Sequence, residues 1–127
     1  IYDTTQSIKK KSAMEQSLSI YRNNVEISNL LKTTANKVKI TDELNLAKTA
    51  ISLLLSMIKD TYIKKYNLPE NQVVSTIACL IYFNEPYETA QDIINGNENI
   101  SDIDMMLFLL NTLREQIYNY KKFIESN

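Results

Sequence analysis

Only three of the 127 residues are glycine or proline, and this scarcity restricts the chain to folds with few tight turns. Gly96, Pro69 and Pro86 are too few to join the strands of a sheet, and Asn95-Gly96 is the one dipeptide suited to a hairpin. Helices need fewer turn residues for the same length of chain. The sequence therefore predicts an all-α fold, a single compact bundle of about five helices, two or three long and two short.

The clearest helical pattern lies near the C-terminal end of the sequence. Apolar residues alternate there at spacings of three and four, as in a heptad repeat; they are Ile103, Met106, Leu110, Leu113, Ile117, Tyr120 and Ile124. Ser101 and Asp104 resemble a capping box at the start of the pattern. We expect one helix over residues 102–125, whose apolar seam faces either the protein's own core or a second copy.

Two more long helices are expected in the first half of the chain. The first runs from residue 3 or 4 to 38, and its apolar pattern changes phase near Val25 and Ile27, which predicts a bend or a change of packing partner. The second covers residues 41–66, with Thr41 as its N-cap. Its apolar residues cover more than half of its circumference, which is typical of a central bundle helix.

Two shorter helices are expected between the long ones. One opens at Pro69 and covers residues 70–83, although the β-branched and aromatic residues at 73–83 leave a buried strand as the alternative. The other opens at Pro86 and closes before Gly96, following the usual preference for proline at the first position and glycine beyond the last. We expect one domain over residues 1–127, with most of its core contributed by the helices at 41–66, 70–83 and 102–125.

Charge is divided unevenly along the chain, although the whole carries only −1. Residues 1–65 contain 11 Lys or Arg and 6 Asp or Glu, a net charge of +5, whereas residues 66–127 contain 3 and 9, a net charge of −6. Two interpretations remain open. Either the opposite charges pack together or are solvated separately, or they bind a partner or further copies of the chain.

The charge pattern leads to a prediction of function. We predict a non-catalytic protein–protein interaction module, of the assembly, adaptor, inhibitor or immunity type, whose partner is another protein or its own copies. Residues 85–104 hold six acids and no base, which predicts an acidic contact surface. The candidate contact residues, with two aromatic neighbours, are Glu85, Glu88, Asp92, Glu98, Asp102, Asp104, Tyr82 and Tyr87.

The alternative is a small nucleic-acid-binding subunit that uses the basic N-terminal region. Its candidate phosphate contacts are Lys9, Lys10, Lys11, Arg22, Lys32, Lys37 and Lys39. Lys32 and Lys39 are one heptad apart and can share a face, but three consecutive lysines spread around a helix. With only two arginines in the chain, bidentate recognition of guanine is poorly supplied. Protein binding therefore ranks above nucleic-acid binding.

Several kinds of chemistry lack their usual residues in this sequence. It contains no histidine and one cysteine, Cys79, which excludes nucleophile–histidine pairs and typical zinc sites. The carboxylate pairs Glu85 with Glu88 and Asp102 with Asp104 fall at helix starts, where acids normally complement the helix dipole. We predict no enzyme activity, no cofactor and no metal. The apolar stretches are far shorter than the roughly 20 residues of a membrane span, so we expect no transmembrane segment.

A few features bear on origin rather than mechanism. The chain has 12 lysines and two arginines, which predicts a low-GC source and an accessory protein of viral or bacterial type. Because it opens at Ile1 instead of methionine, we expect an upstream segment that was processed or trimmed. Cys79 lies in an apolar run and predicts a buried thiol, which slightly favours the cytoplasm.

Overall fold

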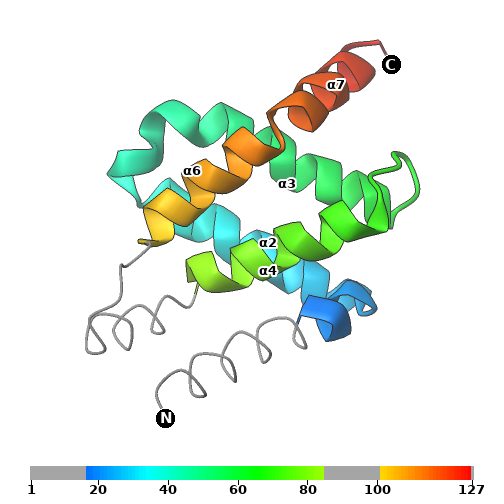
Figure 1. Ribbon diagram of the computed structural model, residues 1–127, viewed down its shortest axis with the longest axis horizontal. Coiled ribbons are helices and arrows are strands. Elements are labelled where there is room, and N and C mark those ends of the chain that lie inside the picture. Colours follow the sequence, from blue (N-terminus) through cyan, green and yellow to red (C-terminus); the bar gives the residue numbers. More distant parts are fainter. Residues whose placement is uncertain (1–16, 85–100, 127) are drawn as a thin grey trace.

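The computed structural model describes residues 17–84 and 101–126, and every regular element in these two ranges is helical. A helical segment at residues 17–21 precedes α2 (Asn24–Lys39), the 3₁₀ helix η1 (Asp42–Ala47), α3 (Lys48–Tyr62), α4 (Glu70–Asn84), α6 (Asp102–Thr112) and α7 (Arg114–Glu125) (Figure 1). The prediction of an all-α bundle is confirmed. The short helix expected after Pro86 lies outside the described residues.

The phase shift in the first long pattern corresponds to a break in the helix at Asn23. The Asn23 Oδ1 atom accepts the backbone amides of Val25 and Glu26 at 3.0 and 3.1 Å, so this side chain caps α2. Just before the break, the Tyr21 carbonyl accepts the Tyr62 hydroxyl of α3 at 2.8 Å, and the two rings meet edge to face at 5.9 Å. Burial and the neighbouring Tyr21 raise the pKa of Tyr62, which keeps its hydroxyl a donor.

The helix predicted over residues 41–66 is shorter than expected at both ends. Residues 42–47 form η1, and the Thr41 hydroxyl does not cap a helix but donates back to the Lys37 carbonyl at 2.6 Å. α3 contacts α2, η1, α6 and α7, in agreement with a central position. The buried residues of α3, together with one residue of η1, are Leu44, Ile51, Leu54, Met57 and Ile58.

α3 ends in a Schellman motif. The backbone amides of Lys65 and Lys64 donate to the carbonyls of Asp60 and Thr61 at 2.8 and 3.3 Å, the two hydrogen bonds that define this cap. Lys64 adopts the left-handed conformation with φ of 64°, which glycine occupies more readily because it lacks a Cβ atom. The motif therefore ends the helix four residues earlier than the apolar pattern predicts.

The segment for which the sequence allows helix or strand is a helix. α4 begins directly after Pro69, whose carbonyl accepts the amide of Val73 at 3.1 Å. Its buried residues, Val73, Thr76, Ile77, Leu80, Ile81 and Phe83, follow helical spacing. The Thr76 hydroxyl is satisfied within the helix by the Gln72 carbonyl at 2.7 Å. The β-branched residues of this stretch therefore pack in the core of a helical bundle and do not belong to a strand.

The single helix expected over residues 102–125 is interrupted at Leu113. This residue has φ −100° and ψ 15°, and it separates α6 from α7. The Thr112 hydroxyl donates to the Phe108 carbonyl at 2.9 Å, a back-bond of the kind that bends helices. The interruption lets α6 pack against α4 while α7 packs against α3. Most of the predicted seam faces the protein's own core, since these residues are buried: Met106, Leu113, Ile117 and Tyr120.

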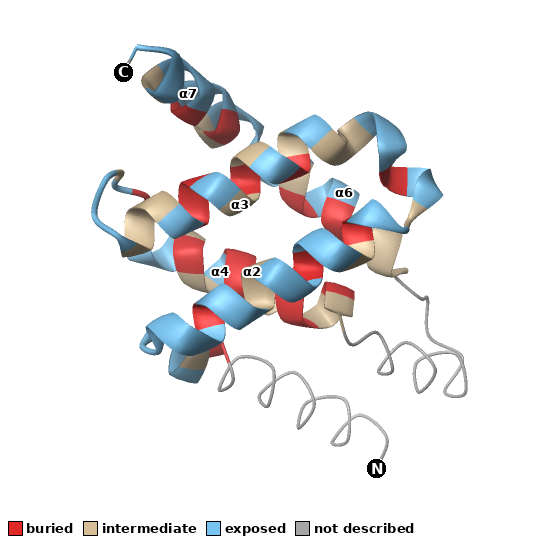
Figure 2. Ribbon diagram, turned by 180° about the vertical axis from the view of Figure 1, so that it is seen from behind, coloured by how far each residue is buried: buried red, intermediate tan, exposed pale blue. Residues whose placement is uncertain are grey.

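Buried residues lie on the facing sides of the helices, and exposed residues cover the outer sides (Figure 2). The core is one continuous cluster to which α2, α3, α4, α6 and α7 all contribute. As the sequence predicts, α3, α4 and the C-terminal helices supply most of it. α2 adds only Ile27 and Val38 among its apolar residues, together with the buried Thr34.

Candidate functional site

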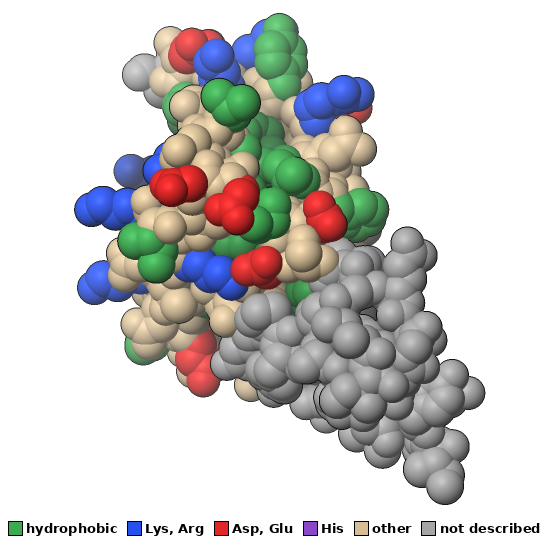
Figure 3. All heavy atoms as spheres, turned by 90° about the vertical axis from the view of Figure 1, so that its left-hand side faces the viewer, with side chains coloured by type: hydrophobic (Ala, Val, Ile, Leu, Met, Phe, Trp, Pro, Cys, Tyr) green, Lys and Arg blue, Asp and Glu red, His purple; other side chains and the backbone are tan. Residues whose placement is uncertain are grey.

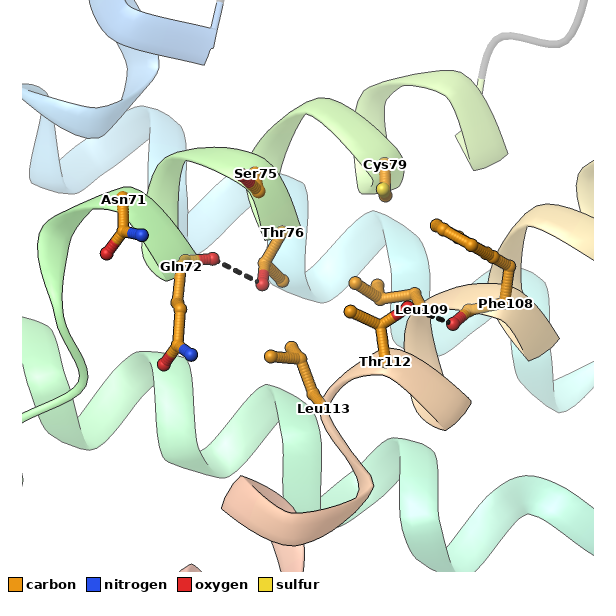
Figure 4. A pocket seen from close by; sticks show the side chains of 9 residues that line it. All are labelled: Asn71, Gln72, Ser75, Thr76, Cys79, Phe108, Leu109, Thr112 and Leu113. Atoms are coloured by element: carbon orange, nitrogen blue, oxygen red, sulfur yellow. Dashed lines mark hydrogen bonds between the residues drawn. The ribbon is translucent and has the colours of Figure 1, made fainter.

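A groove lies between α4 and α6, which run antiparallel along it (Figure 4). It encloses about 160 Å³. One end is formed by Asn71 and Gln72 beside Leu113, and the other by Cys79 opposite Phe108. The remaining lining residues are Ser75, Thr76, Leu109 and Thr112. The packing of these two helices thus leaves a shallow hollow on the surface of the bundle.

The lining of the groove is largely apolar in its exposed atoms. The hydroxyls of Thr76 and Thr112 donate to carbonyls one turn earlier in their own helices, so their hydrogen-bonding capacity is partly used. None of the described residues that line the groove is charged. Phe108 is 62% exposed at the edge of the groove, and its neighbour Leu107 is 43% exposed. An exposed phenylalanine beside an apolar hollow is typical of a binding surface.

Cys79 forms part of the groove wall and is half-buried. Burial raises the pKa of its thiol, so the neutral form predominates at physiological pH. A thiolate is the reactive form of cysteine, and the environment of Cys79 disfavours it. Cys79 therefore contributes an apolar contact to the groove instead of a nucleophile.

Beyond the Cys79 end of the groove, Lys37 of α2 joins the end of α4 to the start of α6. Its Nζ atom lies 2.8 Å from Asp102 Oδ2, donates to the Phe83 carbonyl and sits 4.4 Å from the centre of the Phe83 ring. The Lys37 and Asp102 side chains are only 25% and 27% exposed. Burial alone would raise the pKa of Asp102, but the hydrogen bond and charge of Lys37 and the Ile103 amide bring it below its ordinary value. We call Lys37, Phe83 and Asp102 the lysine clamp.

Asn84 extends this polar region toward the middle of α2. Its Nδ2 atom donates to Thr34 Oγ1 at 2.9 Å and to the Leu80 carbonyl at 2.8 Å. Because the Thr34 hydroxyl already donates to the Leu30 carbonyl at 2.8 Å, its oxygen must act as the acceptor. The last turn of α4 is thus fixed to α2 by one side-chain hydrogen bond, from Asn84 to Thr34, as well as by the lysine clamp.

The predicted acidic contact residues have different environments in the structure. Asp102 is engaged by Lys37, so its charge is largely neutralised within the chain. Asp104 is exposed on α6, one turn before Phe108, and has no ion pair with any described residue. Tyr82 is half-buried on α4 and makes contacts of its own. The other five candidates lie outside the described residues: Glu85, Tyr87, Glu88, Asp92 and Glu98.

The predicted phosphate contacts among the described residues are not gathered into one site. Lys37 is held in the lysine clamp, and Arg22 is exposed at the break before α2. Lys32 and Lys39 are both exposed and seven residues apart, so they share a face of α2 as expected. The triplet Lys9, Lys10 and Lys11 lies outside the described residues. Of this group, two lysines on α2 remain as a common exposed surface.

At the other end of the bundle, a cluster of aromatic rings holds α7. Tyr120 donates a 2.5 Å hydrogen bond to Asp60 Oδ2 of α3, and its ring meets that of Tyr66 edge to face at 5.0 Å. Phe123 lies 5.0 Å from the same Tyr66 ring. Burial, followed by the hydrogen bond and charge of Asp60, raises the pKa of Tyr120 well above its ordinary value. Tyr120 is therefore a core residue, as the apolar pattern predicts. Tyr118 is exposed, with Lys122 Nζ 4.5 Å from its ring centre.

The described residues contain no cluster that suggests a metal site. Among them, no three Cys, Asp or Glu side chains come together in a way that would hold a metal ion. Asp102 and Asp104 have different environments, because Asp102 is held by Lys37 while Asp104 is exposed. In the same ranges, no helix is both long and apolar enough to cross a membrane.

Exposed hydrophobic side chains also occur away from the groove. Ile40 and Leu46, on either side of the start of η1, are exposed, and Leu46 is as accessible as in an extended chain. On the side of the molecule that includes η1 and the start of α6, hydrophobic and acidic side chains lie next to one another (Figure 3). Of these exposed apolar regions, the groove between α4 and α6 combines such side chains with a hollow.

Of the groove residues, the sequence predicts Leu113 as part of the heptad seam and Cys79 as a buried thiol, but it does not single out Phe108. Phe108 and Leu107 lie off the heptad seam of α6, in an apolar run from Met105 to Leu110. A helix that packs on one side does not need apolar residues all round, so this run is the sequence signal for the exposed surface. Comparison with known proteins gives no further guide, because no family model, curated protein or solved structure matches this chain.

Proposed function

We propose that the protein is a helical module that binds a segment of another protein in the groove between α4 and α6. The observation that supports this most strongly is the exposed Phe108 side chain at the edge of an apolar hollow. Burying such a ring against a partner removes a large apolar area from water, and aromatic side chains in this position often dominate binding energy.

The size of the groove indicates what part of a partner it accepts. A cavity of about 150 Å³ holds a benzene molecule, so the 160 Å³ groove suits one aromatic or branched aliphatic side chain. The uncharged lining disfavours a charged group at this position, because nothing there would replace its water. The expected ligand is therefore a peptide segment that inserts one apolar side chain.

Asp104 adds a charge preference to this surface. It precedes Phe108 by one helical turn and is exposed without an ion pair among the described residues. A lysine or arginine of the partner, about one turn from the inserted side chain, would lie beside it. The acidic contact surface proposed from the sequence then includes Asp104, while Asp102 serves the lysine clamp.

A photo-crosslinking experiment tests the proposal. Benzoylphenylalanine is introduced at Phe108 and, as a matched control, at Tyr118, an exposed aromatic residue on α7. We expect one crosslinked protein other than the chain itself from position 108 and no such protein from position 118. Phe108→Ser should then weaken the binding of that protein about thirtyfold, the effect of losing a strong interface residue, whereas Tyr118→Ser should not. Binding that survives Phe108→Ser unchanged would exclude the groove.

The single thiol gives an independent measure of occupancy. Cys79 is the only cysteine in the chain and lines the groove, so alkylation reports on this site alone. A bound partner should slow alkylation of Cys79 in the folded protein. An unchanged rate in the presence of saturating partner would place the contact elsewhere.

Nucleic-acid binding remains the alternative proposal, with weaker support. Lys37 is engaged within the chain, and Lys32 and Lys39 provide a small exposed basic surface on α2. Phosphate binding must weaken steeply with added salt. An anisotropy titration with a labelled oligonucleotide at low and high salt distinguishes this alternative from groove binding, since Phe108→Ser would not affect it.

A further inference from the structure

Four exposed lysines flank the contacts of the Tyr66 ring, which join two distant parts of the sequence. Lys64 and Lys65 follow α3, and Lys121 and Lys122 lie on α7; all four are exposed. The Tyr66 ring, next to the first pair in sequence, contacts Tyr120 and Phe123 next to the second pair, both at 5.0 Å between centres. We call these four lysines the basic end.

The basic end carries unneutralised charge and exposed apolar side chains. None of its lysines forms an ion pair with a described residue. The nearby Asp60 carboxylate accepts a hydrogen bond from the Tyr120 hydroxyl and Glu125 lies one turn after Lys121, so two negative charges stand beside the four lysines. Ile63, Tyr118 and Ile124 are exposed in the same region. Lysines beside exposed apolar groups suit a partner segment that is acidic and partly apolar.

The chain itself contains a segment of that chemistry. Residues 85–104 hold six acids and no base, and Tyr87, Ile93 and Ile94 are also found there. With Asp102 taken by Lys37 and Asp104 assigned to the groove, four acids of this stretch remain to match the four lysines. We propose that the basic end of one molecule binds the acidic stretch at residues 85–104 of a second copy.

Distance favours a second copy over contact within one molecule. Both ends of residues 85–100 are fixed near the lysine clamp, through Asn84 and Asp102. The 15 residues of α4 span about 22 Å from Asn84, near the lysine clamp, to Glu70, which follows Lys64 and Lys65 in the chain. A 16-residue segment held at both ends reaches out at most about 27 Å when fully extended. It would barely touch the basic end of its own molecule and could not lie along it.

The resulting contact is head to tail. Two different surfaces of the chain meet, so each molecule keeps one free basic end and one free acidic stretch, and further copies add to form open chains. This association is separate from groove binding, because neither Phe108 nor Cys79 belongs to the basic end. It should weaken as salt screens the charges.

Charge-swap complementation tests the proposal by sedimentation velocity at about 50 mM and 500 mM salt. The wild-type protein should associate at the lower salt and dissociate at the higher. Lys121→Glu/Lys122→Glu and Glu88→Lys/Asp92→Lys should each weaken self-association about tenfold or more. An equimolar mixture of the two variants should recover association, because each supplies the surface that the other lacks.

The control variant is Lys32→Glu/Lys39→Glu, which alters net charge as much as the basic-end variant but on α2, and it should associate like the wild type. Phe108→Ser should also associate normally, which separates this proposal from groove binding. A wild-type monomer at low salt, a mixture that fails to recover association, or a control variant that dissociates would each overturn the proposal. So would salt-sensitive oligonucleotide binding that is lost in Lys121→Glu/Lys122→Glu while self-association persists.

Discussion

α6 and α7 are separated only by Leu113, yet different interactions hold them in place. α6 is fixed at its start by the lysine clamp, an ion pair that remains partly open to water. α7 is fixed by packed rings around a buried Tyr120, with one hydrogen bond to Asp60. Ion pairs near the surface contribute little and depend on salt, whereas buried aromatic packing contributes more and does not. The attachment at the start of α6 should therefore be weaker and more dependent on salt than the ring cluster of α7, while the buried Met106 and Leu109 hold the rest of α6 in the core.

Of the variants that test this comparison, removal of the Tyr120 side chain should lower the free energy of unfolding most. Tyr120→Ala leaves a cavity between α3 and α7, and we expect it to lower the free energy of unfolding by about 3–5 kcal/mol. Urea denaturation followed by circular dichroism measures this loss. Tyr118→Ala on the exposed side of α7 is the control, expected within about 0.5 kcal/mol of wild type. Equal losses in the two variants would show that the rings do not hold α7.

Breaking the lysine clamp should cost less. Lys37→Met keeps most of the side-chain length but removes the charge, and we expect a loss of about 1–2 kcal/mol. Lys32→Met, at an exposed position of the same helix, should be close to neutral. Hydrogen exchange should show faster opening of α6 amides than of α7 amides in Lys37→Met. Uniform acceleration of both helices would contradict separate attachment.

The two attachments should also respond to pH in opposite ranges. The pKa of Asp102 is lowered in the folded protein, so its contribution is present above the unfolded value near 3.8 and is lost as pH falls through the folded value. The pKa of Tyr120 is raised, so its contribution is complete below about 10 and is lost as pH rises toward the folded value.

The difference in stability between the wild type and a single variant isolates the contribution of each of these two groups. The stability difference between wild type and Asp102→Asn, about 1 kcal/mol at neutral pH, should shrink in acid. The difference between wild type and Tyr120→Phe should shrink in alkali. Either difference remaining constant across its range would show that the group does not titrate with unfolding.

The smallest expected effect is a gain in stability. Lys64→Gly places glycine at the left-handed position of the Schellman motif, which should stabilise the protein by about 0.5–1 kcal/mol. The same change removes a lysine from the basic end, so self-association should weaken as stability rises. Thermal unfolding and sedimentation velocity on one sample would measure both. A loss of stability would mean that the Lys64 side chain stabilises the fold through contacts that outweigh its backbone strain.

The features that could be predicted from the sequence are those set by local pattern. The cap at Ser101, the buried stripe of α3 and the burial of Tyr120 follow from spacing and residue type. The end of α3 at Tyr62 could not be predicted, because Lys64 adopts a conformation that sequence rules assign to glycine. The interruption at Leu113 was equally hidden, since an unbroken heptad pattern spans it.

The binding surfaces were less accessible to prediction, because both depend on residues brought together by tertiary packing. The groove needs α4 and α6 side by side, and the basic end unites lysines more than 50 positions apart in sequence. The lysine clamp shows the same limit, since it pairs Lys37 with Asp102, which the sequence interpretation assigned to two different binding surfaces. Charge counted along the chain does not reveal which charges are paired.

Leu113 lies between the two proposed binding surfaces in the chain. It lines the groove and directly precedes α7, whose first turn begins with the hydrogen bond from the Ile117 amide to the Leu113 carbonyl at 2.8 Å. Leu113 therefore connects the lining of the groove to the first turn of α7, the helix that carries two lysines of the basic end, Lys121 and Lys122.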